Sequence, residues 1–157
     1  MPRTPTPCSC GSGSSAGRER GRAGRRRAIP RHRLRSSARS IVARIESYSP
    51  GRVVVDGVEL HRDVIVLPDR VLTEWWRRDG HSLAIEDLDD VLDDLPERLV
   101  LGCGYASQLQ PDAAVIAALG RRGVKVEALP TDQAVERFSE LEARNPAAVA
   151  AALHLTC

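Results

Sequence analysis

The sequence predicts an α/β fold in three layers, in which helices flank a mixed β-sheet. The main observation is the stretch 98–131, where two apolar runs, 99–101 and 124–129, enclose a glycine loop and a helical stretch that begins after Pro111. Apolar runs bounded by Gly and Pro, with a helix between them, are typical of a βαβ unit. Parallel strands joined in this way normally lie inside a sheet that helices cover.

An antiparallel meander upstream of this unit makes the predicted sheet mixed. Ser-Pro-Gly at residues 49–51 is a turn signal between two strand-like runs. Asp-Gly at residues 56–57 lies between VVV and VEL, and this is the strongest short-range hairpin signal. We expect the meander to continue into a buried strand over residues 63–67, which Pro68 ends.

Residues 85–95 predict a helix with one apolar face. The apolar residues recur at helical spacing, at Ile85, Leu88, Val91, Leu92 and Leu95. The opposite face carries six carboxylates: Glu86, Asp87, Asp89, Asp90, Asp93 and Asp94. We interpret these carboxylates as a solvated face, which could at most dock a basic partner.

Two further helices are predicted on either side of the second parallel strand. The first runs over residues 111–122, with Gly120 or Gly123 as its C-cap and three inward side chains, Val115, Ile116 and Leu119. The second runs over residues 132–142, for which Thr131 is a good N-cap.

The last segment of the chain has two interpretations. Asn-Pro at residues 145–146 and the alanines that follow favour a short helix. Residues 153–157 alternate in polarity, however, and could instead form an edge strand.

Charge divides the chain into two parts. Residues 1–40 hold eleven arginines and one acid, a net charge of +10, whereas residues 41–157 hold 12 bases and 20 acids, a net charge of −8. The first part is rich in Arg, Gly, Pro and Ser and cannot bury enough apolar surface to fold, so we expect a disordered tail followed by a single α/β domain over 41–157.

The tail has three interpretations. Lys125 is the only lysine beside 22 arginines, a bias typical of GC-rich genomes, in which translation from upstream of the true start would yield this composition. The tail would then be inert, or it would result from a misassigned translation start. An arginine-rich segment could also bind nucleic acid non-specifically, or it could be a mitochondrial transit peptide, although Gly and Pro interrupt it.

The four cysteines and the hydropathy favour a reducing, cytoplasmic, bacterial setting. Cys8 and Cys10 have the wrong spacing for a zinc knuckle or a redox pair. No run of 18 apolar residues is present, so we expect no membrane span. No cluster of residues has metal-ligand spacing, so we expect no metal site.

The glycine loop after the first parallel strand resembles part of a dinucleotide fingerprint. Gly102 and Gly104 are present, but Ser107 stands at the third glycine position, and no carboxylate ends the second strand. We therefore expect no cofactor and interpret the loop as a turn with positive φ. Another anion could still bind at the helix start near Pro111.

Two adjacent tryptophans, Trp75 and Trp76, are the other unusual feature. In a chain with so few aromatic residues, we expect at least one of them in the core, while the other could cap a pocket or an interface. Arg77, Arg78 and His81 follow and could hold an anion, but we interpret them as solvated loop charges.

His81, Cys103 and His154 are the possible catalytic side chains. A histidine close to Cys103 could activate its thiol as a nucleophile. No local signature supports that pairing, and a small side chain fits between two glycines, so we interpret Cys103 as structural. No catalytic residue is assigned.

The chain resembles a small α/β family, domain of unknown function 498. The resemblance rests on Tyr-Ser-Pro-Gly at 48–51, the hairpin at 55–57, the two tryptophans, Gly-x-Gly at 102–104 and the His-Leu-Thr-Cys terminus. It implies a mixed five-stranded sheet with flanking helices and covers about residues 41–157. Phe138 and Ser139 stand where many relatives have Tyr-Asn.

The resemblance also implies an assembly role without chemistry. Members of the family include an adipogenesis-associated protein and a mitochondrial factor that assembles NADH dehydrogenase. We therefore favour a non-catalytic module that binds a protein partner, of undetermined oligomeric state. The alternative is a small-ligand binder or enzyme whose pocket combines the loop 102–110, including Gly102, Cys103 and Gly104, with Thr131 and the loop from Trp75 to His81.

Overall fold

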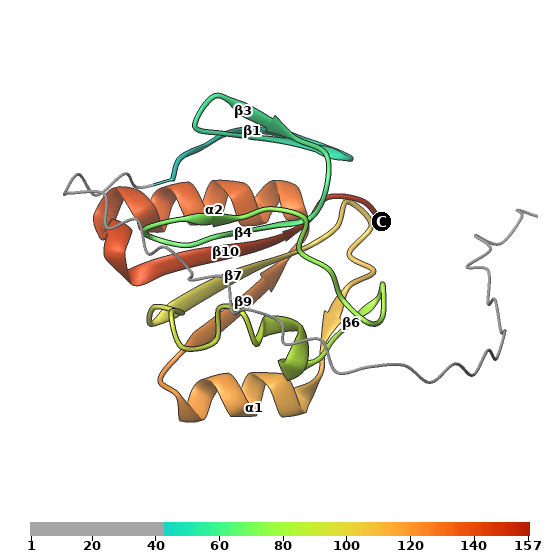
Figure 1. Ribbon diagram of the computed structural model, residues 1–157, viewed down its shortest axis with the longest axis vertical. Helices are drawn as coiled ribbons and strands as arrows, with labels where there is room; N and C mark the ends of the chain where they lie inside the picture. The colour runs from blue at the N-terminus through green and yellow to red at the C-terminus, as the bar shows by residue number, and fades with distance from the viewer. Residues whose placement is uncertain (1–42) are drawn as a thin grey trace, which may run out of the picture. The chain divides into compact units, whose positions relative to one another are not determined.

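A five-stranded mixed sheet is the centre of the computed structural model, which describes residues 43–157 (Figure 1). The predicted tail lies outside the described residues. The strand order is β5 (Val71–Leu72), β4 (Val64–Val66), β10 (Val149–His154), β7 (Arg98–Cys103) and β9 (Lys125–Leu129). β7 pairs in parallel with both β9 and β10, whereas β4 pairs antiparallel with β10 and β5. The predicted mixed α/β sheet is therefore confirmed.

The predicted βαβ unit consists of β7, α1 (Ala113–Arg121) and β9. The helix begins two residues later than expected, because Pro111 belongs to the short strand β8 (Gln110–Pro111), which pairs with β6 (Ser82–Leu83). Gly123 follows the helix with φ of 81°, in keeping with a glycine cap. Ile116 was expected to face inward but is 47% exposed, so only Val115 and Leu119 of the three predicted side chains are buried.

The meander is correct in its turns but forms a sheet of its own. β1 (Ile45–Ser49), β2 (Arg52–Val55) and β3 (Val58–Leu60) pair antiparallel in sequence order. Asp56 and Gly57 have φ of 50° and 77°, which is the two-residue turn that Asp-Gly favours. β4 was expected to extend this meander; instead it pairs with β10 and β5 in the central sheet.

The last segment is neither a helix nor an edge strand. After the 3₁₀ turn η2 (Pro146–Ala148), β10 lies between β4 and β7 near the middle of the sheet, and all six of its residues are buried. The alanines are needed for burial on both faces rather than for helix propensity, because small side chains let other layers approach the strand closely. Tertiary packing therefore overrides the local preference.

The predicted helix over 85–95 is also wrong. Only a 3₁₀ turn, η1 (Ile85–Leu88), forms, and turns follow it. In an α-helix the carbonyl of Asp87 would accept the N–H of Val91, but it accepts Trp75 Nε1–H at 2.8 Å, and Val91 N–H donates to Leu88 instead. The inward side of the segment is as predicted, because Leu88 and Val91 are buried.

The carboxylates of this segment are not all solvated, as they were expected to be. Asp87 is half-buried, and its carboxylate accepts the backbone N–H groups of Ala84 at 2.9 Å and Arg78 at 3.2 Å. Asp87 is therefore a structural residue of the turn.

Two apolar clusters cover the two faces of the central sheet, which makes the three layers. One face packs against α1 and η1, with Leu99, Leu101 and Leu119 fully buried. The other packs against α2 (Thr131–Arg144) and the β1–β3 sheet, through residues such as Val100 and Phe138 (Figure 1). Within residues 43–157, no helix is long and apolar enough to cross a membrane.

Candidate functional site

The glycine loop and Thr131 meet at the carboxyl ends of the parallel strands. Thr131 is fully buried and begins α2 instead of capping it; the N-cap position is Pro130. Its hydroxyl accepts the N–H of Gly104 at 2.8 Å and donates to the carbonyl of His154 at 2.7 Å. The backbone of Thr131 donates back to the Gly104 carbonyl at 3.2 Å. Thr131 therefore joins the ends of β7 and β10.

The glycines are required by close packing at this junction. A Cβ on Gly102 would lie 2.9 Å from the Thr131 hydroxyl. Gly104 has φ of 91°, as expected for the loop, and a Cβ there would collide with the backbone of Thr156 and Cys157.

The N–H groups of the glycine loop bind the chain itself. Ala106 and Gln108 donate their backbone N–H groups to the main-chain oxygen of Cys157 at 3.1 and 3.3 Å. These are the groups that a phosphate-binding loop would present to an anion. The ligand pocket predicted from the loop 102–110 stays a prediction.

The two candidate catalytic side chains of the loops, Cys103 and His81, lie in different environments. Cys103 lies in the apolar cluster, is 3% exposed, and burial raises the pKa of its thiol. A raised thiol pKa is the opposite of what a nucleophile needs. His81 is exposed, and its backbone carbonyl accepts the N–H of Gln110 at 2.9 Å.

The sequence left open whether a histidine lies close to Cys103. The strand register places one there, because it aligns Cys103 on β7 with His154 on β10. His154 is buried, however, and its nearest polar partners are the side chains of Asp63 and Arg77. Among the described residues, no group of three His, Cys, Asp or Glu side chains gathers in a way that could hold a metal ion.

The buried side chains of Arg77 and His154 form a cluster with the partly buried Asp63. Asp63 Oδ2 lies 2.8 Å from Arg77 Nη2 and 2.8 Å from His154 Nδ1, and Oδ1 accepts the N–H of Leu155 at 2.9 Å. The guanidinium of Arg77 stacks on the ring of Trp75, 4.6 Å from its centroid. Arg77 was expected to be a solvated loop charge; it is buried because it pairs with Asp63 and stacks on Trp75.

The cluster keeps Asp63 ionised. Burial alone would raise the pKa of Asp63, but the hydrogen bonds from His154 and Leu155 and the charge of Arg77 outweigh it, so this pKa lies below its usual value. An ionised carboxylate only accepts hydrogen bonds, so His154 Nδ1 carries the proton. The 2.9 Å contact between Nδ1 and Arg77 Nη2 then joins two donors that share one acceptor oxygen.

Three buried atoms of the cluster are left without a hydrogen-bond partner within residues 43–157: Arg77 Nε, Arg77 Nη1 and His154 Nε2. The side chains of Arg77 and His154 are only 5% and 7% exposed. An unpaired buried polar group costs about 1–3 kcal/mol, and more when it is charged. Such a group in a folded protein calls for an explanation.

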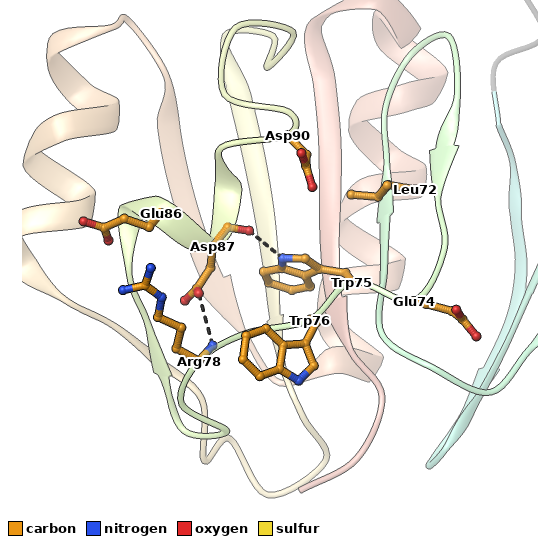
Figure 2. Close-up of a pocket in the computed structure, with 8 residues that line it drawn as sticks. All are labelled: Leu72, Glu74, Trp75, Trp76, Arg78, Glu86, Asp87 and Asp90. Carbon is orange, nitrogen blue, oxygen red and sulfur yellow. Dashed lines mark hydrogen bonds between the residues drawn. The ribbon is translucent and has the colours of Figure 1, made fainter. Parts of the chain in front are cut away.

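The two tryptophans have opposite roles. Trp75 is 6% exposed and belongs to the core, as one of the pair was expected to, and Figure 2 shows its indole nitrogen donating to Asp87. Trp76 is 75% exposed.

Trp76 lines two surface hollows. The first, of about 280 Å³, is drawn in Figure 2, where Arg78 lies beside Asp87 and Glu86 and the Trp76 ring lies below that of Trp75. It is lined by Leu72, Glu74, Trp75, Trp76, Arg78, Glu86, Asp87 and Asp90. The second, of about 270 Å³, is lined by His61, Arg62, Asp63, Glu74, Trp75, Trp76 and Thr156. We call the residues of the first hollow the Trp76 surface.

The sequence did not single out Asp63 for the site and misjudged Arg77. Asp63 directly precedes a buried strand, and a charge next to a buried apolar run is a weak signal for burial because loop charges occupy the same positions. Arg77 has no such signal, since the residue before it is the exposed Trp76.

Comparisons with known proteins agree with this fold. A family model described as a protein of unknown function (DUF498/DUF598) matches residues 45–154. Among solved structures, the chain is similar to an outer membrane protein from Bartonella henselae, with 24% identity and a TM-score of 0.62, over 73% of this chain and 96% of that one.

Two further structures cover 73% of this chain and 99% of their own. One is the conserved hypothetical protein PH1505 from Pyrococcus horikoshii OT3, with 25% identity and a TM-score of 0.61. The other is MT938, with 27% identity and a TM-score of 0.56. The family model spans well over half of the chain. The chain therefore belongs to the DUF498/DUF598 family of proteins of unknown function.

Proposed function

We propose that this chain is a non-catalytic protein-interaction module and that the Trp76 surface binds a basic segment of its partner. The observation that carries the proposal is the 75% exposure of Trp76 at a hollow of about 280 Å³. Tryptophan is one of the three residue types, with tyrosine and arginine, that are enriched among the few residues carrying most of the binding energy of an interface.

The charges of this surface indicate the chemistry of the partner. Four carboxylates line the hollow, at Glu74, Glu86, Asp87 and Asp90, against one cation, Arg78. A lysine or arginine of the partner would meet these carboxylates and could stack on the Trp76 indole. Complementary charge of this kind sets partner choice and association rate.

The positions of Cys103 and His81 also favour interaction over catalysis. The alternative of a ligand pocket or enzyme site would be supported by an enclosed pocket containing buried His81 or Cys103. Cys103 lies in the apolar core instead, and His81 is exposed.

Site-specific photo-crosslinking in cells tests the proposal. A photoreactive phenylalanine analogue is placed at Trp76 of the full chain, and at Tyr105 as a matched control, since Tyr105 is 63% exposed and does not line the hollow. We expect a crosslinked protein at position 76, with a lysine- or arginine-rich crosslinked peptide. The crosslink should disappear when Glu86 and Asp90 are replaced with Lys.

Two results would contradict the proposal. One is a set of crosslinked proteins at position 76 that is the same as at position 105. The other is a specific crosslinked peptide that is neutral or acidic and survives the charge reversal, because charge complementarity would then play no part.

A further inference from the structure

We propose that the buried cluster of Asp63, Arg77 and His154 binds a small oxyanion group, a carboxylate or a phosphate, through the atoms of Arg77 and His154 that the fold leaves unpaired. This site adjoins the Trp76 surface and shares Trp75 with it, but it does not depend on a partner bound there.

Arg77 supplies the donors. A guanidinium has five N–H donors, and in this fold only Nη2 has a partner, the Asp63 carboxylate at 2.8 Å. Nε and Nη1 have none within the part of the chain that the structure describes, although the side chain is 5% exposed. Arginine is well suited to carboxylate and phosphate groups because its N–H groups match their oxygens.

Trp75 leaves these donors free. The Cζ atom of Arg77 lies over the Trp75 ring, 4.6 Å from the ring centroid. A cation–π contact occupies no hydrogen-bond acceptor and gives none to the N–H groups. Nε–H and Nη1–H therefore still need an acceptor, which an oxyanion can supply while the contact with Trp75 is kept.

His154 supplies the third atom. Its Nδ1–H donates to Asp63 at 2.8 Å, which orients the ring and leaves Nε2 as the unpaired position. Nε2 accepts a hydrogen bond when the ring is neutral and donates one when the ring is protonated. An oxyanion that shares one proton with Nε2 gives this atom a hydrogen-bond partner whether the ring is neutral or protonated. The remaining oxygens of the oxyanion accept hydrogen bonds from Arg77.

The three unpaired atoms lie close enough for one small group. Arg77 Nη2 and His154 Nδ1 are 2.9 Å apart, and each unpaired atom lies two covalent bonds from one of these two. The hollow of about 270 Å³ that is lined by Asp63, Trp75, Trp76 and Thr156 reaches the cluster at Asp63, whereas Arg77 and His154 lie behind its lining. Because the three unpaired atoms are buried, the site would take a group of a few atoms rather than a large ligand.

Nuclear magnetic resonance of the full-length, ¹⁵N-labelled protein tests the site. The protein is titrated with sodium phosphate and, separately, with sodium acetate, at constant pH and with sodium chloride keeping the ionic strength fixed. We expect saturable shifts of the Arg77 Nε and His154 Nε2 resonances with at least one of the two salts. The salt that acts distinguishes a phosphate ligand from a carboxylate ligand.

Two variants separate this site from general charge effects. Arg77→Lys keeps a cation opposite Asp63 but removes both unpaired donors, so we expect the His154 Nε2 shift to lose its saturation or to require at least tenfold more anion. Arg78→Lys, at the exposed neighbouring arginine, should titrate like the wild type.

The proposal is overturned if neither salt gives a saturable shift in the wild type, or if Arg77→Lys responds as the wild type does. If Arg77→Lys does not fold, the wild-type titration decides: a saturable shift of both nuclei beyond that with chloride supports the site, and its absence refutes it.

Discussion

Replacing Thr131 with Val tests the junction between the glycine loop and β10 most sharply. Val has nearly the shape of Thr, so the change removes a hydroxyl without opening a large cavity. The N–H of Gly104 and the carbonyl of His154, at 2.8 and 2.7 Å from that hydroxyl, both lose a buried partner. Each lost hydrogen bond costs about 1–3 kcal/mol of unfolding free energy. We expect about 2–4 kcal/mol in total, because the His154 carbonyl can regain part of its loss by accepting another hydrogen bond.

The measurement is unfolding in denaturant, supported by thermal unfolding. At about 4 °C for each kcal/mol, the expected fall in Tm is roughly 8–16 °C. Thr131→Ser keeps the hydroxyl and should lose only about 1 kcal/mol for the missing methyl. Thr73→Val, at an exposed threonine, should stay within about 0.5 kcal/mol of the wild type. If Thr131→Val and Thr131→Ser are equally stable, the hydroxyl does not join the two strands.

Three further predictions concern other contacts. In denaturant unfolding, Gly104→Ala should destabilise the protein by more than about 1 kcal/mol, because φ is 91° and a Cβ would collide with backbone. Gly120→Ala, in a helix with open space around the residue, should stabilise it by about 0.5–1 kcal/mol. If Gly104→Ala were the more stable of the two variants, the glycine loop would not have this conformation. Trp75→Phe removes the donor to the Asp87 carbonyl, so we expect about 1–3 kcal/mol of destabilisation and faster hydrogen exchange at residues 88–94; unchanged exchange would contradict the role of that bond. The folded-state pKa of Asp63 is lowered, so its contribution to stability is complete above the unfolded pKa of about 4 and is lost as the pH falls through the folded pKa. In denaturant unfolding, Asp63→Asn should therefore cost more free energy at about pH 5 than at about pH 3. An equal cost at both pH values would refute an ionised, paired Asp63.

The features that local sequence determines were predicted well. Asp56 and Gly57 adopt the positive φ angles of a hairpin turn, because this dipeptide favours that conformation whatever surrounds it. The βαβ unit was found for a similar reason, since its buried strand, glycine loop and helix follow one another along the chain.

The features that depend on distant partners were missed. The alanines of β10 read as helix formers, and only the neighbouring strands and the layers on both faces make them a central strand. The segment that starts at Ile85 reads as a helix, but Trp75 takes the carbonyl of Asp87 that the helix would need. Local propensity could not reveal either partner.

The polar site was missed for the same reason. Asp63 and His154 are 91 residues apart in the sequence, yet the antiparallel pairing of β4 and β10 places them side by side. Arg77 reaches the same point from an irregular loop. The exposed Arg78 is its neighbour in the same loop, so residue type alone could not separate a buried, paired arginine from a solvated one.

The affinity of the chain for the partner captured at Trp76 tests the central claim most directly. The dissociation constant is measured for the wild type, Trp76→Ala and Tyr105→Ala, each at low and high salt. We expect Trp76→Ala to bind at least about 30-fold more weakly, as a hot-spot residue worth about 2 kcal/mol would, Tyr105→Ala to bind like the wild type, and wild-type binding to weaken as salt rises. Equal affinities of Trp76→Ala and the wild type would contradict the account.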